Sequence, residues 1–243
     1  TEYTADAATA RKELIQADFD ALATALYQKE AIDTILDLDA FARFMLTNDL
    51  VCNQELGHPK STYLFKEDLS NPDSKIKFGP LWDFDWAFGY EESSSYFNTG
   101  ATEDLYSGRS GKAGYNFYNA LRNTEAGKRA YYKEWLDFVA EGRIEELNEY
   151  IRDYTEFALA SIAHNNDANV YEKNYTEFAL ASIAHNNDAN VNEKNSTDYV
   201  ATIARSQQWM SDRAQFIFRN LTKYDDISAG VEIPEEFGDP LET

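Results

Sequence analysis

Two aspartates one residue apart, Asp83 and Asp85, lie in the most aromatic segment of the chain, KFGPLWDFDWAFGY. If this segment is a β-strand, residues two apart point to the same face, so the two carboxylates would lie side by side. Like charges that share a pocket need cations, backbone donors or a metal ion around them, because bare carboxylates are costly at low dielectric. Carboxylate oxygens beside substrate phosphates are ligands that Mg²⁺ prefers. The alternative is a turn at the strand end, in which Asp83 accepts backbone N–H bonds and Asp85 caps the next segment of the chain.

A predicted β-hairpin positions these aspartates. Ser61 to Lys66 and Lys75 to Trp82 alternate polar and apolar residues on either side of the turn-rich segment SNPDS. This alternation predicts an antiparallel hairpin over about residues 61–83. Asp83 and Asp85 would then lie just after the end of its second strand.

Most of the remaining chain has the periodicity of amphipathic helices, which indicates an α+β fold that is mainly α. Asp37 or Asp39 is placed to cap the second helix. We expect helices at 7–27, 37–52, 115–122, 125–139, 143–162 and 196–221. The segment 91–114 mixes small polar residues with aromatics and predicts a long loop packed over the site. The acidic end, 227–243, predicts a loosely held tail, so the helical lobe would span 1–226.

The charge of the chain limits its partners. Its 43 acidic and 22 basic residues give a formal net charge of -21 and a pI near 4.4. Such a balance argues against nucleic acid and anionic membranes as partners and favours cations. The sequence has no apolar run near the length of a membrane span, and it begins at Thr1 without a leader, as a piece of a longer protein would. The single cysteine, Cys52, predicts a small buried residue.

A tandem repeat interrupts the helical part. Residues 154–174 read YTEFALASIAHNNDANVYEKN and residues 175–195 read YTEFALASIAHNNDANVNEKN, with one difference. Two near-identical copies indicate a recent duplication rather than a solenoid. Asp153 and Asn174 each lie three residues before a glutamate, Glu156 and Glu177, which is the arrangement of a capping box, so each copy is expected to form a short helix with its own start and stop. The spare copy would extend a helix, loop out, or exchange with a neighbouring molecule.

The block FGPLWDFDWAFG, together with HPKSTYLFKED and LDLDAFARFMLTNDL before it, resembles the CotH kinase family, which is named for a spore-coat protein kinase. The later segments KRAYYKEWLDF and WMSDRAQFIF resemble that family's helical tail. The resemblance implies the C-terminal lobe of an atypical protein kinase, with helices around a short antiparallel hairpin. It also implies ATP as substrate, a magnesium ion on Asp83, and an exported or cell-surface bacterial protein.

Two departures from the family limit this inference. Its catalytic loop carries an aspartate and, five positions later, an asparagine, whereas Glu55 and Lys60 stand here. Glutamate can accept a hydroxyl proton, but a protonated lysine cannot ligate magnesium and would instead hold a phosphate. Asn53 is close enough in sequence to replace the missing ligand. The family's nucleotide-binding first lobe is also expected before Ile32, so the resemblance predicts a fragment that lacks that lobe.

Three functions therefore compete. The first is Mg²⁺-dependent phosphoryl transfer from ATP to a protein hydroxyl, with Asp83 and Asp85 on the metal, Glu55 as base, and Lys60 and His58 toward phosphate. The second is a non-catalytic surface module whose acidic and aromatic pocket holds a cation, a glycan or a peptide. The third is hydrolysis by paired carboxylates, which would need a partner such as Glu55 at a greater separation.

Overall fold

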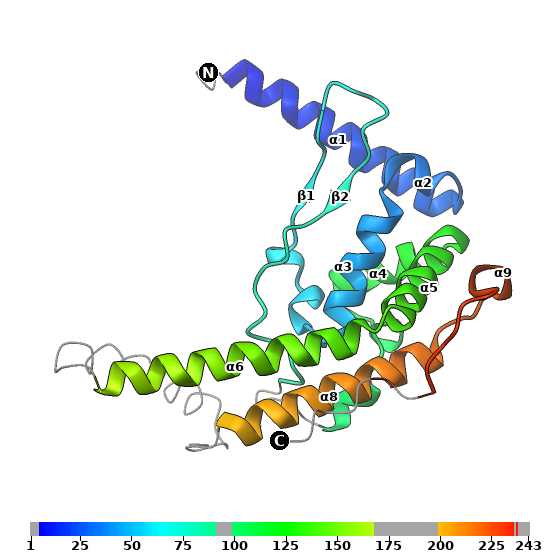
Figure 1. The fold of residues 1–243 in the computed structure, drawn as a ribbon. Helices are drawn as coiled ribbons and strands as arrows, with labels where there is room; N and C mark the ends of the chain where they lie inside the picture. Colours follow the sequence, from blue (N-terminus) through cyan, green and yellow to red (C-terminus); the bar gives the residue numbers. More distant parts are fainter. Residues whose placement is uncertain (1–4, 91–98, 168–198, 236, 238–243) are drawn as a thin grey trace.

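The computed structural model describes residues 5–90, 99–167, 199–235 and 237 (Figure 1). The described part is mainly helical with one small antiparallel sheet, which confirms the α+β, mainly α expectation. Two long helices, α6 and α8, lie side by side at one end of the molecule in Figure 1, and the hairpin extends from the other end along α1. The candidate site residues lie between these two ends.

The predicted helices are present with ends that differ by a few residues. The described helices are α1 (Ala5–Gln28), α2 (Ile32–Ile35), α3 (Leu38–Leu50), α4 (Ala113–Arg122), α5 (Glu125–Ala140), α6 (Arg143–Asp167), α8 (Tyr199–Asn220) and α9 (Asp225–Ser228). Short 3₁₀ helices are η1 (Gln54–Gly57), η2 (Pro59–Ser61), η3 (Thr99–Glu103) and η4 (Tyr106–Gly108). The sequence did not predict α2 or α9. The segment expected as one long loop holds η3 and η4, while its residues 91–98 lie outside the described part.

The central helix, α3, begins where the sequence predicts. The Asp37 carboxylate accepts a hydrogen bond from the backbone N–H of Ala40 at 2.9 Å, which satisfies one of the donors that a helix start leaves without a partner. Helix α3 packs against α5. Its other end, at Leu50, leads directly into η1.

The hairpin is shorter than predicted but antiparallel as predicted. Strand β1 is Leu64–Phe65, strand β2 is Lys77–Phe78, and Leu64 pairs with Phe78. Pairing stops before Pro80, which has no backbone N–H to donate. The chain from Gly79 to the aspartates is therefore not a strand.

One aromatic side chain ties the hairpin to the helices. Phe78 of β2 lies with its ring centroid 5.4 Å from that of Phe41 and 5.1 Å from that of Phe44, both on α3. These rings join a continuous core that includes the fully buried Trp135 of α5 and Ile217 of α8. The loop after β2 is thus anchored on α3 at its start.

Helix α6 differs from the expectation for the repeat. It continues without a break from Arg143 through Asp153 to Asp167, so the predicted helix start at the first capping box is wrong. Packing against α8 keeps α6 helical through Asp153, where the capping box alone would begin a new helix. Tyr150, Tyr154 and Phe157 form an exposed aromatic stripe on α6, with exposed fractions between 61% and 68%. The second copy, 175–195, and its predicted exchange between molecules lie outside the described residues.

The segment after α9 contacts the core at one point. Phe237 is buried, its ring lies edge-on to Phe218 of α8, and its carbonyl accepts a bond from Gln215 at 3.4 Å. Residues 229–235, just before this contact, form no regular element. Among the described residues, no helix is both long and apolar enough to cross a membrane.

A half-buried lysine gives a pH-dependent contribution to stability. Burial lowers the pKa of Lys223 to about 8, and its Nζ lies 3.4 Å from the ring centroid of Phe218. Between about pH 8 and the unfolded value near 10.5, the unfolded chain binds more protons at this position than the folded chain does. The free energy of unfolding of the native protein should therefore rise with pH in this window relative to Lys223→Met. Urea unfolding of both proteins at about pH 7 and about pH 9.5 measures these free energies. The same change with pH in the native protein and in Lys223→Met would contradict the prediction.

Candidate metal centre

Asp83 and Asp85 lie in an irregular loop after the hairpin, so of the two arrangements left open by the sequence the strand face is wrong and a turn beyond the strand end is present. Asp83 has a left-handed backbone with φ of +67°. Asn53 contributes to this conformation, because its side-chain N–H donates to the Asp83 carbonyl at 3.4 Å. This turn, and not the side-chain alternation of a strand, brings the carboxylates of Asp83 and Asp85 together.

Glu55 reaches the same place from a separate segment, η1. The buried Asn53 begins this 3₁₀ helix by accepting a hydrogen bond from the backbone N–H of Glu55 at 3.1 Å. The Asn53 amide nitrogen also donates to Asn48 at 3.0 Å. The amide of Asn53 thus holds both chain segments that carry the carboxylates.

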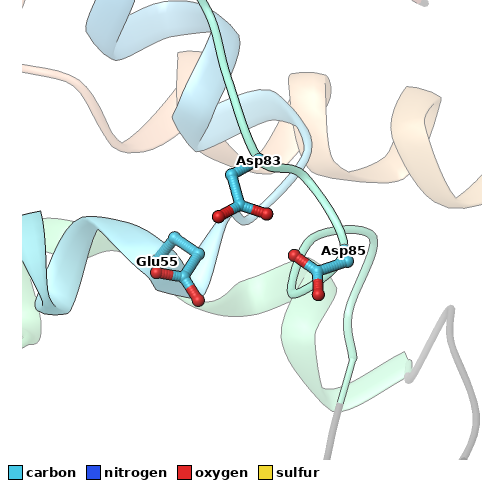
Figure 2. A group of neighbouring side chains, drawn as sticks. All are labelled: Glu55, Asp83 and Asp85. Carbon is cyan, nitrogen blue, oxygen red and sulfur yellow. The ribbon is translucent and has the colours of Figure 1, made fainter. Parts of the chain in front are cut away.

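The three carboxylates form one cluster. One oxygen from each of Glu55, Asp83 and Asp85 lies within 4.8 Å of the other two. Figure 2 shows Glu55 and Asp85 on either side of Asp83, with the three groups facing a common space. Glu55 is half-buried and the two aspartates are exposed, so the cluster opens to solvent.

Hydrogen bonding separates the pKa values of the two aspartates. The Ser61 hydroxyl donates to Asp83 Oδ2 at 2.7 Å, and this bond lowers the pKa of Asp83. The bond that Asp85 shares with Asp83 raises the pKa of Asp85, with burial and the neighbouring charge adding to it. Asp83 is therefore the carboxylate that stays ionised most readily.

Burial raises the pKa of Glu55, and the charges of Asp83 and Asp85 raise it further. The charges of His58 and Lys60 act in the opposite direction, which places both residues near Glu55. His58 and Lys60 are exposed, and their backbones form the tight turn from η1 into η2. The six sequence-predicted site residues thus gather around one loop pair, with the cations toward solvent.

Backbone contacts fix the two loops to each other. The Gln54 N–H donates to the Trp86 carbonyl at 3.0 Å, and the Gln54 side chain donates to the carbonyl of Tyr90. The Phe88 N–H donates to the Val51 carbonyl at 2.5 Å. These bonds explain how carboxylates from segments far apart in sequence keep one geometry.

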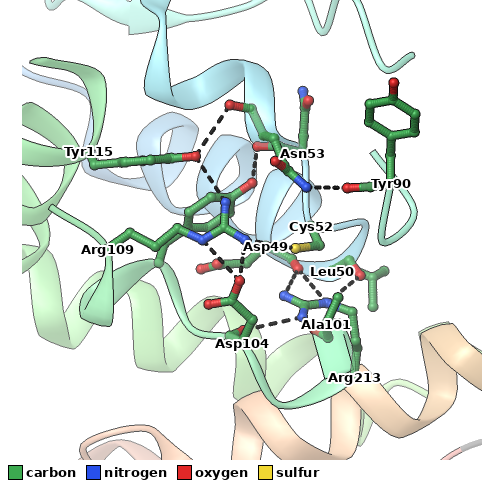
Figure 3. Close-up of polar contacts among 12 residues, drawn as sticks. Asp49, Leu50, Cys52, Asn53, Tyr90, Ala101, Asp104, Arg109, Tyr115 and Arg213 are labelled. Atoms are coloured by element: carbon green, nitrogen blue, oxygen red, sulfur yellow. Dashed lines mark hydrogen bonds and ion pairs between the residues drawn. The ribbon is translucent and has the colours of Figure 1, made fainter. Parts of the chain in front are cut away.

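A buried cation supports the loop from below (Figure 3). Arg213 of α8 is fully buried and donates to carbonyls at the end of α3, at 2.9 Å to Asp49 and 3.1 Å to Leu50. It also donates to the carbonyls of Ala101 and Asp104. The positive charge complements the carbonyls that a helix C-terminus leaves without partners.

Cys52, between α3 and η1, is buried as predicted. Burial raises the pKa of its thiol, and its sulfur accepts a bond from Arg109 at 3.4 Å. Arg109 also pairs with Asp104 and donates to Tyr115 at 2.9 Å. This network packs η4 and α4 against the loop of Glu55.

The residues that support the carboxylates were not predicted from the sequence. Ser61 stands beside Lys60, and a hydroxyl next to a candidate site is a signal that could have found it. The role of Arg213 comes from contacts over long sequence separations, which periodicity does not reveal.

A family model described as CotH kinase protein matches residues 1–217. The chain belongs to the CotH kinase family. The match includes all three carboxylates of the cluster and ends within α8 at the buried Ile217. Searches of curated proteins and of solved structures found no match to this member of the CotH family.

The cluster suits a small divalent cation. In octahedral coordination with bonds of about 2.1 Å, adjacent ligands of Mg²⁺ lie about 3 Å apart and opposite ligands about 4 Å apart. The three carboxylate oxygens of this CotH-family protein lie within 4.8 Å of one another, so shifts on the order of 1–2 Å would let them share one ion. All three donors are the hard oxygens that Mg²⁺ prefers, and a cation would offset their mutual repulsion.

Proposed function

We propose that this CotH-family protein takes part in Mg²⁺-dependent phosphoryl transfer from ATP to a protein hydroxyl. The observation that carries the proposal is the convergence of Glu55, Asp83 and Asp85 from two loops of a CotH kinase domain. Phosphoryl transfer needs positioning and charge stabilisation more than covalent chemistry, and rigid carboxylates around a cation provide both.

Each residue has a role in this proposal. Asp83 and Asp85 would hold the ion, and Ser61 keeps Asp83 ionised and oriented. A magnesium ion held there would supply positive charge against the charge that develops on the transferred phosphoryl group. Glu55, whose pKa is raised, accepts the proton of the acceptor hydroxyl.

The remaining candidates act around this centre. Lys60 and His58, both exposed, supply positive charge for phosphate at the open side. Asn53 positions the other groups, since its amide oxygen already accepts from the Glu55 backbone. An exported or surface location belongs to the same proposal and rests on the family alone.

Isothermal titration calorimetry with Mg²⁺, with ATP and with both tests the proposal. We expect binding that requires both and that weakens about tenfold or more in Asp83→Asn, because the variant loses a charged ligand. Asp73→Asn is the matched control, since Asp73 is exposed in the hairpin turn. Transfer of labelled phosphate to the chain itself or to casein then tests catalysis. Absence of heat in every titration would contradict the proposal.

One observation favours the second function, a binding module. Trp82, next to Asp83, is 61% exposed and lies edge-on to the exposed Tyr63, with ring centroids 6.5 Å apart. Exposed aromatic pairs of this kind stack on sugars and apolar side chains. Heat of binding to a glycan or peptide that is lost in Trp82→Ala, without phosphate transfer, would favour this function.

A further inference from the structure

A small pocket at the junction of α4, α5 and α8 has a charge unlike that of the chain as a whole. Its volume is about 100 Å³, and two cations, Arg122 and Lys128, line it. No carboxylate is among the described residues that line it, although acidic residues outnumber basic ones by 43 to 22 in this sequence. The larger groove between α5 and α6, by contrast, is lined by four carboxylates.

The pocket is also rich in hydrogen-bond donors. Those that line it are Ser107, Arg122, Asn123, Lys128, Asn220 and Thr222. The guanidinium of Arg122 is buried and uses one N–H toward Asp49 at 3.5 Å and another toward Asn119 at 2.8 Å. Arginine has five such donors, so about three remain for a further acceptor.

Lys128 has no ion-pair partner within 4 Å in the part of the chain that the structure describes. Its ammonium does not serve the nearby helix ends either. The Leu121 carbonyl accepts from Thr124, and the Phe218 carbonyl accepts from Lys223. Lys128 therefore lines the pocket without a structural role that the described contacts reveal.

A third cation lies behind the pocket wall. Lys223 follows Thr222, and its Nζ is 5.4 Å from the ring centroid of Tyr132, a lining residue. Burial alone lowers the pKa of Lys223, because no carboxylate among the described residues offsets the loss of water there. An anion in the pocket would restore that balance.

We propose that this pocket binds a phosphate-class oxyanion at a site separate from the carboxylate cluster. A volume of about 100 Å³ equals roughly three water molecules and is well below the roughly 300 Å³ or more of a nucleotide-sized or drug-sized site. Charged donors around a compact dianion give short, strong hydrogen bonds. The proposal does not depend on phosphoryl transfer, since the two sites share no residue.

The test is calorimetric titration of the full chain with inorganic phosphate, at constant ionic strength and without divalent ions. We expect saturable binding in the millimolar range or tighter that weakens about tenfold or more in Lys128→Gln. Lys12→Gln on the exposed face of α1 is the matched control and should bind as the native chain does. Asp83→Asn should also bind phosphate normally, which separates this result from a failure at the carboxylate cluster.

A second variant tests the pocket with a substitution that should not impair folding. Asn123 is exposed at the end of α4, so Asn123→Asp adds a carboxylate at the pocket without a change of shape. It should abolish phosphate binding while the melting temperature stays the same or rises. Non-saturable heat, or saturable binding that neither Lys128→Gln nor Asn123→Asp changes, would overturn the proposal.

A further titration with O-phosphoserine, with serine as its control, tests whether the oxyanion is a free ion or a phosphorylated side chain. Binding of both phosphate and phosphoserine supports recognition of the phosphoryl group on a side chain. Binding of phosphate alone supports a site for the free ion.

Discussion

Arg213→Met is expected to lower the free energy of unfolding by about 3–5 kcal/mol, because it removes a fully buried cation from four backbone carbonyls. Methionine fills much of the same space but donates no hydrogen bond, so carbonyls at the end of α3 and beside η3 lose a donor in an environment that excludes water. Urea unfolding followed by circular dichroism measures the change.

The comparison with other variants separates charge from packing at Arg213. Arg213→Lys should be intermediate, since one ammonium cannot span carbonyls on both segments as the guanidinium does. Arg219→Met, on the exposed face of the same helix, should change the free energy by less than about 0.5 kcal/mol. If Arg213→Met were as mild as Arg219→Met, the carbonyls would not depend on this side chain.

Gly114→Ala should destabilise the protein by about 3 kcal/mol and also weaken binding of Mg²⁺ with ATP. A Cβ at Gly114 would lie 1.8 Å from the carbonyl oxygen of Leu56, a distance that no side-chain rotation relieves. Leu56 follows Glu55 in η1, so α4 and the loop that carries Glu55 of the carboxylate cluster must move apart. Calorimetry and urea unfolding on the same preparation measure both effects.

Gly108→Ala is the control for this substitution. An added Cβ at Gly108 meets nothing within 4 Å, and its backbone is not left-handed. It should leave stability and binding close to those of the native chain. A Gly114→Ala protein with native stability but weak binding would mean that η1 moves without cost. Native binding would show that the contact does not position Glu55.

The sequence predicted the helices well because their apolar residues recur along one face over many turns. Of the two predicted caps, Asp37 begins α3, and the prediction succeeded because a capping side chain acts on its own backbone neighbours. The capping box at Asp153 failed for the complementary reason, since tertiary packing of α6 on α8 overrode a local preference. Predictions from local sequence signals were therefore correct where no long-range contact opposed them.

The sequence predicted which residues form the candidate site but not the backbone geometry that brings them together. Asp83 and Asp85 are neighbours in space, yet the cause is the left-handed turn at Asp83 and its contact with Asn53, not strand alternation. Glu55 joined them through the resemblance to a family motif. Ser61 could have been found from its place beside Lys60, but Gly114 and Arg213 act through contacts that join distant segments, and a single sequence carries no signal of such contacts.

The aromatic stripe of α6 has a consequence for the colloidal behaviour of the protein. Tyr150, Tyr154 and Phe157 present contiguous apolar surface to water, which favours adhesion between molecules. At neutral pH the net charge of -21 keeps molecules apart by repulsion. That repulsion vanishes as the pH approaches the pI of about 4.4, where attraction through the stripe is no longer opposed. Solubility of this protein should therefore depend on its surplus of carboxylates, including those far from any site.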